Sequence, residues 1–499
     1  MPERRLLAAV DLGSNSFRLL IGRVEQNQLG EQVLPIDSLK DSVRLAAGLG
    51  KDGKLDADSQ RRAVEALQRF GERLRSFSPD AVRAVATNTL RVARNARSVL
   101  ATAEAALGFP IQVIAGYEEA RLIYLGAAHA LAVDDQFRLV VDIGGGSTEC
   151  IIGCNYDSLK LESATVGCVT LSQQYFVNGQ VDAENFGHAC YTARAVLAPI
   201  ALAYRKHGWK YAVGTSGTAK ALVQAAQMNF GADELTREHL AQLAELLIKA
   251  GHVDRIKLEG LKPERRPVFA GGLAVMTAVF DELDIVSMRY CNGALRQGVM
   301  YDLLGRSSGA DMRDITVAQM IGRYGADAPH GERVATTAVA IFGQVIRGAQ
   351  EDVDRRRQVL AWGARLGEIG MSISHEDFHK HSAYVLANAD MPGFTRDEQN
   401  QLSNLAVAQT GGLRKLKPLL VGDADWLMVL SLRLANILHR RRDDETMMLP
   451  ALFFKRGKVR IEVPKVWAND HPLSDESLHA ETAAWREVAV FDEISYQRL

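Results

Sequence analysis

Residues 6–24 read Leu-Leu-Ala-Ala-Val-Asp-Leu-Gly-Ser-Asn-Ser-Phe-Arg-Leu-Leu-Ile-Gly-Arg-Val, and residues 138–153 read Arg-Leu-Val-Val-Asp-Ile-Gly-Gly-Gly-Ser-Thr-Glu-Cys-Ile-Ile-Gly. Each stretch has two apolar runs around a short polar turn that contains glycine, which predicts a β-hairpin. The aspartates of the two turns, Asp11 and Asp142, are 131 positions apart (142 − 11), a spacing of domain size rather than that of a short repeat. The sequence therefore predicts two similar α/β domains that face one another.

The two turns, Val10–Ser16 and Val141–Thr148, carry the residue types of phosphate-binding loops. Glycine lets a backbone approach an anion closely, and consecutive N–H groups can then form a nest for its oxygens. Asp11 and Asp142 would repel a phosphate, but they suit Mg²⁺, which keeps much of its water shell. One such turn alone could be a tight hairpin and nothing more, whereas two copies with matching flanks favour phosphate binding. The candidate phosphate ligands in the turns are Gly13, Ser14, Asn15, Ser16, Gly144, Gly145, Gly146, Ser147 and Thr148.

Around the turns, short apolar strands alternate with amphipathic helical stretches. A helix is predicted at Asp58–Phe77, strands at Val82–Ala86 and Ile111–Ile114, and a further helix from Gly116 to about His129. Further along, Gly271-Gly272 is expected to form a packing turn that enters a helix.

The pattern changes after Gly305–Gly309, which has the composition of a linker. Helical periodicity then dominates until Ala451–Pro464, which alternates like a β-hairpin. One apolar helix face in this part consists of Val334, Ala338, Ile341, Phe342 and Val345. We therefore expect an α/β fold with two domains, 1–125 and 126–305, that face a cleft, followed by a mostly helical domain, 312–499, with a small β-hairpin.

Composition restricts the class of protein. The chain has 499 residues and a net charge of −1, so any anion must be bound by local patches rather than by a global basic field. The five cysteines form no C-x-x-C pair, which favours buried thiols over disulfides or zinc. No run of about 18 apolar residues and no signal-peptide pattern occurs. We expect a cytoplasmic protein without integral membrane association and without a nucleic-acid partner.

In combination, the turns resemble the two phosphate motifs of the actin-like ATPase superfamily. More narrowly, the chain resembles the exopolyphosphatase/guanosine pentaphosphate phosphohydrolase family, which implies two actin-like (ribonuclease H-like) domains around a catalytic cleft and a C-terminal domain of the HD phosphohydrolase type. The resemblance covers nearly the whole chain. It is carried by residues 9–17 and 141–149 around the turns, Thr-Leu-Arg at 89–91, Gly-Tyr-Glu-Glu-Ala-Arg-Leu-Ile at 116–123, Gly214–Thr218, Gly293-Ala294-Leu295-Arg296 and His379–Tyr384.

Three glutamates are candidates for acid–base or metal chemistry. Glu118 and Glu119 begin a predicted helix, where carboxylates either project into a cleft or simply stabilise the helix N-terminus. The resemblance implies that Glu119 is the base that activates water and that Glu118 is structural or secondary. Glu149 stays open as an alternate base or as a metal ligand beside Asp11 and Asp142.

Further phosphate contacts are implied by the resemblance. Arg91 could clamp a terminal phosphate with its two-pronged guanidinium, and Arg44 is a weaker candidate for a second phosphate. Ser216 and Gly217 could add hydroxyl and amide donors, although a plain turn with a threonine cap would explain the same residues.

The resemblance also implies a metal-binding histidine–aspartate arrangement in the helical part, which this sequence does not keep. His330 fits the first histidine, but Gly367-Glu368 replaces the His-Asp pair and Asn436 replaces the later aspartate. We therefore expect no catalytic metal centre there and a capping or packing role for His375, His379 and His381. Basic runs that could hold a polyanion occur at Arg355–Arg357, Arg414–Lys417 and Arg440–Arg442.

The leading functional hypothesis is a processive exopolyphosphatase that uses Mg²⁺, with K⁺ as an activator implied by the resemblance. The alternative within the family is hydrolysis of guanosine pentaphosphate to guanosine tetraphosphate, which needs the same loops and base. A sugar or acetate kinase and a non-enzymatic sensor are more distant options. Proteins of this fold with a large helical appendage often self-associate, so a homodimer is one candidate assembly.

Overall fold

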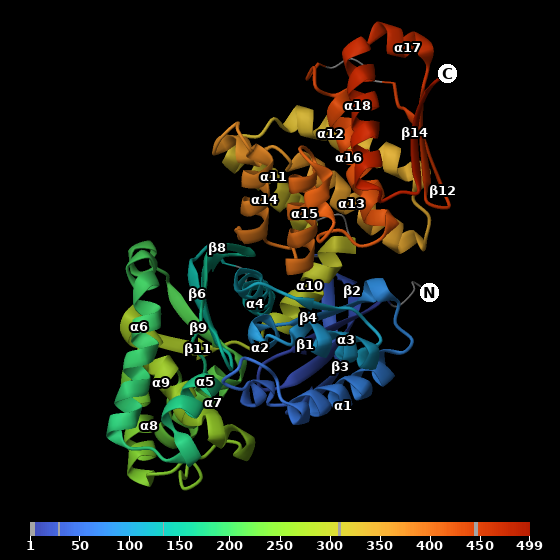
Figure 1. Ribbon diagram of the computed structural model, residues 1–499. Helices are drawn as coiled ribbons and strands as arrows, with labels where there is room; N and C mark the ends of the chain where they lie inside the picture. Colours follow the sequence, from blue (N-terminus) through green and yellow to red (C-terminus); the bar gives the residue numbers. More distant parts are fainter. Residues whose placement is uncertain (1–4, 28–29, 133, 308–310, 444–447) are drawn as a thin grey trace. The chain divides into compact units, whose positions relative to one another are not determined.

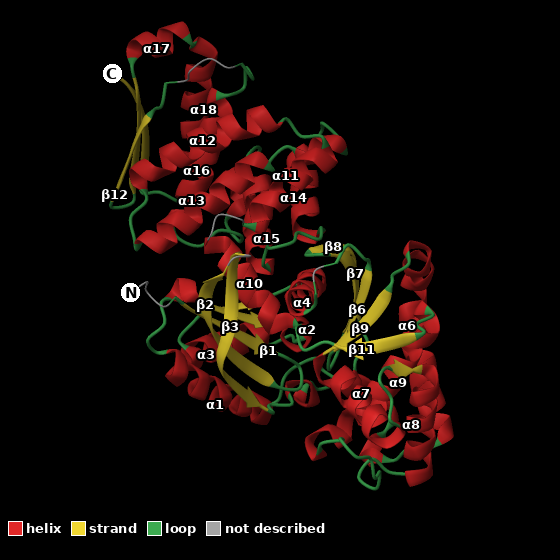
Figure 2. Cartoon of the chain, turned by 180° about the vertical axis from the view of Figure 1, so that it is seen from behind, coloured by secondary structure: helices red, strands yellow, loops and turns green. Residues whose placement is uncertain are grey.

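The computed structural model describes residues 5–27, 30–132, 134–307, 311–443 and 448–499. The chain divides into two compact units, Met1–Asp311 and Met312–Leu499. Colours in Figure 1 follow the sequence, so the first unit runs from blue to yellow and the second from yellow to red, and Figure 2 shows helices in red and strands in yellow. None of the helices in the described ranges combines the length and apolarity needed to cross a membrane.

The first sheet of the first unit carries the first predicted turn. Its elements and the helices around it are β1 (Leu6–Leu12), β2 (Phe17–Asn27), β3 (Gly30–Asp41), α1 (Ala57–Leu74), β4 (Val82–Ala86), α2 (Asn88–Val92), α3 (Ala96–Leu107), β5 (Ile111–Val113), α4 (Gly116–Ala130) and α10 (Leu295–Ser307). The strand order is β3-β2-β1-β4-β5, with β1 antiparallel to β2 and parallel to β4. Because side chains alternate along a strand, Ala8 and Val10 pack with α1 and α3, whereas Leu7 and Ala9 pack with α4 and α10.

The second sheet carries the second predicted turn. Its elements are β6 (Arg138–Ile143), β7 (Thr148–Cys154), β8 (Asp157–Ala164), α5 (Cys168–Tyr175), α6 (Ala183–His207), β9 (Tyr211–Thr215), α7 (Ser216–Phe230), β10 (Leu235–Thr236), α8 (Arg237–Ala250), α9 (Arg266–Leu283) and β11 (Ser287–Tyr290). The strand order is β10-β11-β9-β6-β7-β8. Leu139 and Val141 of β6 pack with α6 and α9, and Val140 between them packs with α4.

The two sheets repeat one topology. Strands β6, β7, β8, β9 and β11 have the same order and relative directions as β1 to β5. The duplicated α/β fold predicted from the two turns is confirmed, and it is the actin-like architecture. Strand β10 adds two residues at the edge of the second sheet.

Local expectations in the first unit hold for the helices and strands but fail at one glycine pair. The side chain of Asp56 accepts a hydrogen bond from the Ser59 N–H and caps α1 where the periodicity begins. Gly271-Gly272 lies inside α9, so the expected packing turn is wrong. A Cβ at Gly271 would lie 2.3 Å from the carbonyl oxygen of Cys168, so the glycine lets α9 pack closely against α5.

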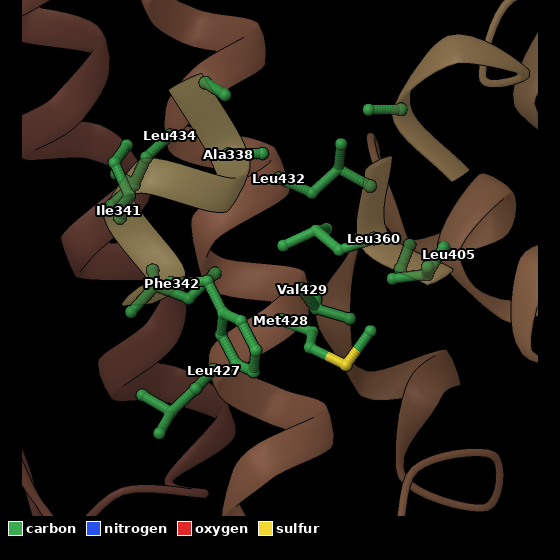
Figure 3. Packing of buried hydrophobic residues seen from close by; sticks show 14 of the residues in the cluster. Ala338, Ile341, Phe342, Leu360, Leu405, Leu427, Met428, Val429, Leu432 and Leu434 are labelled. Carbon is green, nitrogen blue, oxygen red and sulfur yellow. The ribbon is translucent and has the colours of Figure 1, made fainter. Parts of the chain in front are cut away.

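The second unit is a helical body with a small sheet. Its elements are α11 (Met312–Tyr324), α12 (Ala328–Val345), α13 (Gln350–Arg365), α14 (Phe378–Asn388), α15 (Arg396–Ala408), α16 (Asp423–Leu438), β12 (Ala451–Lys455), β13 (Lys458–Val463), α17 (Lys465–Asp470), α18 (Pro472–Val488) and β14 (Glu493–Arg498). Figure 3 shows Ile341 and Phe342 of the predicted apolar face of α12 packed among buried side chains of α16.

The small sheet has three strands rather than the two of the expected hairpin. Strands β12 and β13 form the predicted antiparallel pair, and β14 joins β13 in parallel. The pairing of β14 depends on the chain returning through α17 and α18. Such a long-range parallel contact leaves no local turn signal, which is why the sequence pattern missed it.

Candidate active site

The two predicted glycine loops meet in the first unit. The loop at 13–16 connects β1 with β2, and the loop at 144–147 connects β6 with β7. A Cβ at Gly145 would lie 2.8 Å from the Cβ of Ser14, so the glycine permits the contact between the loops. The hydroxyl of Thr89 donates to the Ser14 hydroxyl at 2.8 Å and fixes the first loop from α2.

A pocket opens where the loops meet. Twelve of the sixteen residues predicted for the site line it, namely Asp11, Gly13, Ser14, Asn15, Ser16, Glu119, Asp142, Gly144, Gly145, Ser147, Ser216 and Gly217. The pocket is small, about 140 Å³, and among the residues that the structure describes, none of those lining it is aromatic. Predicted site residues from β1, β6, α4, α7 and the two loops therefore converge on one pocket.

The other four predicted residues lie behind this lining. The Thr148 hydroxyl donates to the Val166 carbonyl at 2.6 Å inside the fold, so Thr148 is not placed to bind phosphate with its side chain. A Cβ at Gly146 would lie 2.4 Å from Oδ1 of Asn88. Glu149 is 1% exposed and accepts a hydrogen bond from Ser163 at 2.7 Å. Arg91 contacts Glu119 rather than the pocket.

Glu119 is held at the edge of the pocket by Arg91. The Arg91 Nη1 donates to Oε2 of Glu119 at 3.2 Å and to the carbonyl oxygen of Ile114 at 2.9 Å. Burial raises the pKa of Glu119 from its ordinary value of 4.5 to about 7, the charge of Arg91 opposes this, and Asp11 and Asp142 add to it. A carboxyl with a pKa near neutrality is suited to accept a proton from water.

The other carboxyls near the pocket are also shifted. Burial raises the pKa of Asp11 to about 6, with Arg296 and Arg18 opposing and Asp142 adding to the effect. Burial raises the pKa of Asp142 too, although Thr215 donates to its Oδ2 at 2.6 Å. For Glu149, burial and then the charges of Glu119 and Asp142 raise the pKa well above its ordinary value. These carboxylates repel one another, so a cation between them would be favoured.

The donor set fits Mg²⁺ better than a metal held wholly by protein. In the described ranges, no group of three or more His, Cys, Asp and Glu side chains is arranged to hold a metal. Asp11 and Asp142 nevertheless both line the pocket, whereas Glu149 does not. Mg²⁺ is commonly held by one or two carboxylates, water and substrate phosphate. The pocket therefore fits Mg²⁺ through Asp11 and Asp142, with Glu149 outside the set that faces it.

Three arginines that the sequence pattern did not single out also line the pocket: Arg18 from β2, Arg265 just before α9, and Arg296 from α10. Burial lowers the pKa of Arg265 and of Arg296, and the charge of Arg18 lowers both as well. Cations that repel one another in this way are stabilised by a bound anion. A signal for two of them existed, because Arg18 follows Ser16 by the two-residue period of a strand and Arg296 ends the Gly-Ala-Leu-Arg motif.

The start of α7 completes the wall. Ser216 has a φ of 67° and its hydroxyl donates to the Ile143 carbonyl at 3.1 Å. A Cβ at Gly217 would lie 1.1 Å from Nη2 of Arg265, so the glycine leaves room for the guanidinium over the first turn of the helix. The free N–H groups at a helix N-terminus attract anions.

In the second unit, an arginine bridges the acidic residues near His330. The Arg442 Nη2 lies 2.5 Å from Oε1 of Glu368, and its Nη1 lies 3.4 Å from Oδ2 of Asp327. The His330 Nε2 lies 3.6 Å from the same Glu368 oxygen. The first predicted basic run, Arg355–Arg357, also makes an ion pair within its unit, since Arg356 Nη1 lies 2.6 Å from Oδ1 of Asp425. His379 is buried beside Lys415 and Gly411, as a packing role requires.

The duplicated fold, with a glycine loop in each half facing a shared pocket, defines a protein of the actin-like class. Within that class, the chain belongs to the Ppx/GppA phosphatase family. The sequence model of that family matches residues 23–307, and the model of its domain III matches residues 312–482. The protein is thus a member of a family of phosphate-releasing hydrolases.

Solved structures agree on the fold. An exopolyphosphatase from Cytophaga hutchinsonii is 22% identical, with a TM-score of 0.54, and the match covers 60% of this chain and 98% of that one. An exopolyphosphatase-like protein is 24% identical, with a TM-score of 0.53, and the match covers 61% and 99%. At these identities the likeness establishes the architecture over about three-fifths of the chain.

Proposed function

We propose that this protein is an exopolyphosphatase that releases terminal orthophosphate from inorganic polyphosphate, one residue after another. The observation that carries the proposal is the pocket at the two loops. It combines three arginines, the backbone of two glycine loops and a glutamate whose pKa burial raises to about 7. None of the described residues that line it is aromatic, which suits the end of a phosphate chain better than a nucleobase.

The positive groups would bind the terminal phosphates. Arg18, Arg265 and Arg296 come from three separate elements, so together they can surround an anion. Charge-assisted hydrogen bonds from guanidinium groups to phosphate are among the stronger hydrogen bonds in proteins. The amides of the two loops and of the first turn of α7 would orient the same oxygens.

Glu119 would then activate the attacking water. The water oxygen forms a bond to the terminal phosphorus, the bond from that phosphorus to the bridging oxygen breaks, and the bridging oxygen leaves as the new end of the chain. Glu119 takes the proton from the water and later returns it to solvent. Such phosphoryl transfer depends chiefly on positioning and on neutralising charge. Arg91 keeps the Glu119 carboxylate oriented toward the pocket.

A divalent cation would complete the charge balance. Asp11 and Asp142 would hold Mg²⁺ through its water shell, and the ion would neutralise phosphate oxygens as the leaving group departs. We also propose K⁺ as an activator. A chelator in K⁺-free buffer should abolish activity, Mg²⁺ should restore it, and K⁺ added together with Mg²⁺ should raise it further; activity that persists with the chelator, or is the same with and without K⁺, would contradict the respective assignment.

A second substrate is favoured by one further observation. A hollow of about 430 Å³ adjoins the first loop at Asn15 and is lined in part by Phe176, His252 and Arg44. A hollow of this size, with the rings of Phe176 and His252 in its wall and a phosphate site beside it, could hold a nucleoside. Guanosine pentaphosphate, hydrolysed to guanosine tetraphosphate, is therefore the alternative.

Steady-state rates of orthophosphate release from long-chain polyphosphate and from guanosine pentaphosphate distinguish these two candidate substrates. We expect the higher kcat/KM with polyphosphate. A much higher kcat/KM with the guanosine substrate would reverse the assignment, and retention of that preference in Phe176→Ala would show that the adjoining hollow does not hold the base.

A further inference from the structure

Four charged side chains form a buried network next to the catalytic helix. Arg83, Glu118, Arg121 and Asp302 are each 8% exposed or less. Arg121 binds Glu118 with both prongs, at 2.7 and 2.9 Å, and also contacts Asp302. Arg83 donates to Asp302 at 2.5 Å, and its Nη2 lies 3.6 Å from Oε1 of Glu118. Each of the two arginines therefore lies against both carboxylates, Glu118 and Asp302.

The network joins three elements that supply pocket residues or their supports. Arg83 lies on β4, Glu118 and Arg121 lie on the first turns of α4, and Asp302 lies on α10. Glu119 directly follows Glu118 in α4, and Arg296 lies on α10 six positions before Asp302. The network thus connects the helix that bears the proposed base to the helix that bears a proposed phosphate ligand.

The same two helices are also in backbone contact. A Cβ at Gly298 of α10 would lie 1.7 Å from the carbonyl oxygen of Leu122, and a Cβ at Gly126 of α4 would lie 2.1 Å from that of Ala294. Only glycine permits such an approach at these positions. With the ion network beside it, the contact leaves α4 little freedom to slide or rotate against α10.

Stability alone does not explain the network. Buried ion pairs lose solvation on folding, and well-packed apolar residues of similar volume often stabilise a protein as much or more. Unlike apolar contacts, these ion pairs fix the orientation of the side chains. The bidentate Arg121–Glu118 pair and the contacts of both arginines with Asp302 each require a particular geometry. These contacts therefore fix the position of the first turn of α4 along the middle of α10.

We infer that Arg83, Glu118, Arg121 and Asp302 are positioning residues, which fix α4 against α10 so that Glu119 and Arg296 act on the same terminal phosphate. This rests on the proposed function, in which Glu119 accepts the proton of the attacking water. None of the four lines the pocket, so each acts through its neighbours. Glu118, for which the family resemblance implied a structural or secondary role, belongs to this network.

The first test is Asp302→Asn, assayed on polyphosphate well below the melting temperature of the variant. We expect kcat to fall by about 10- to 100-fold, with KM within about threefold, because small displacements of reacting groups cost rate more than binding. The matched control is Glu481→Gln, which removes a carboxylate from the Arg433–Glu481 pair in the second unit, where the side chains are 9% and 10% exposed. It should lower stability and leave kcat unchanged.

A second variant separates positioning from folding. Arg83→Met with Asp302→Leu removes one charge of each sign, so the remaining Glu118–Arg121 pair stays neutral and the protein should melt near the parent temperature. We expect kcat to fall in this double variant as well. Native kcat in either folded variant overturns the inference, as does an equal loss of kcat in Glu481→Gln. If the parent protein does not hydrolyse polyphosphate at all, the proposed function fails instead.

Discussion

Replacing Glu119 with glutamine should stop hydrolysis and, at alkaline pH, make the protein more stable. Glutamine keeps the size of the side chain and can still accept the hydrogen bond that Arg91 donates at 3.2 Å. It cannot accept a proton from water. Loss of a general base typically costs about 10²- to 10⁴-fold in rate, so kcat should fall by that factor while polyphosphate still binds.

The stability effect follows from the raised pKa. The folded protein holds the Glu119 proton up to about pH 7, whereas an ordinary glutamate releases it near 4.5. Between these values the folded state binds more protons than the unfolded state, so this carboxyl lowers stability progressively as pH rises. At 1.36 kcal/mol per pH unit, the full effect is about 3 kcal/mol, reached above pH 7 and absent below pH 4.5.

Thermal unfolding of the parent and of Glu119→Gln, each near pH 5 and near pH 8, measures this effect. The free energy of unfolding of the variant should exceed that of the parent by about 3 kcal/mol at pH 8 and by much less at pH 5. Glu481→Gln, the same chemical change in a buried pair of the second unit, should instead lose stability, because it breaks the ion pair with Arg433. A stability difference independent of pH would refute the raised pKa, and turnover above a tenth of the parent rate would refute the role of Glu119 as base.

The remaining predictions concern the pocket. Because the base must be deprotonated, kcat/KM for polyphosphate should rise about tenfold per pH unit below the pKa of about 7 and level off above it; a rate that falls over this range would contradict the role of Glu119. Arg296→Gln should raise KM by about 10- to 100-fold through the loss of charge-assisted hydrogen bonds, and an unchanged KM would remove Arg296 from the phosphate site. Gly145→Ala should weaken phosphate binding, because the new Cβ would lie 2.8 Å from the Cβ of Ser14, whereas Gly187→Ala in open space should have no effect.

The fold was readable from the sequence where local pattern and topology coincide. The two hairpins with their polar turns are separated by the length of a domain. In each half, a later strand pairs in parallel with the first strand of the hairpin, β4 with β1 and β9 with β6. Gly271-Gly272 was misread because glycine pairs usually mark turns, whereas here the missing side chains serve helix contact. Strand β14 was missed because its pairing with β13 is parallel and distant in sequence.

The site was readable in part, since glycine loops are local features while arginine positions depend on the whole fold. Arg265 illustrates the limit. It lies beside Glu264 in an unremarkable polar stretch, yet the chain brings its guanidinium over Gly217, which is 48 positions away (265 − 217). The motif identified Arg91 as a site residue but gave it the wrong partner. Its guanidinium contacts the Glu119 carboxylate and does not line the pocket.

The chemistry of Glu119 is the property furthest from the sequence. Its neighbours in the chain, Glu118 and Arg121, form an ion pair with each other, and Arg121 also contacts Asp302. Burial raises the pKa of Glu119 most, and the charged groups that modify it, Arg91, Asp11 and Asp142, come from three other elements. A phosphate bound by the arginines would add negative charge near Glu119 and strengthen its affinity for a proton, while a cation at Asp11 and Asp142 would weaken it. Whether polyphosphate, Mg²⁺ or both are bound should therefore control how much of the base is deprotonated at neutral pH.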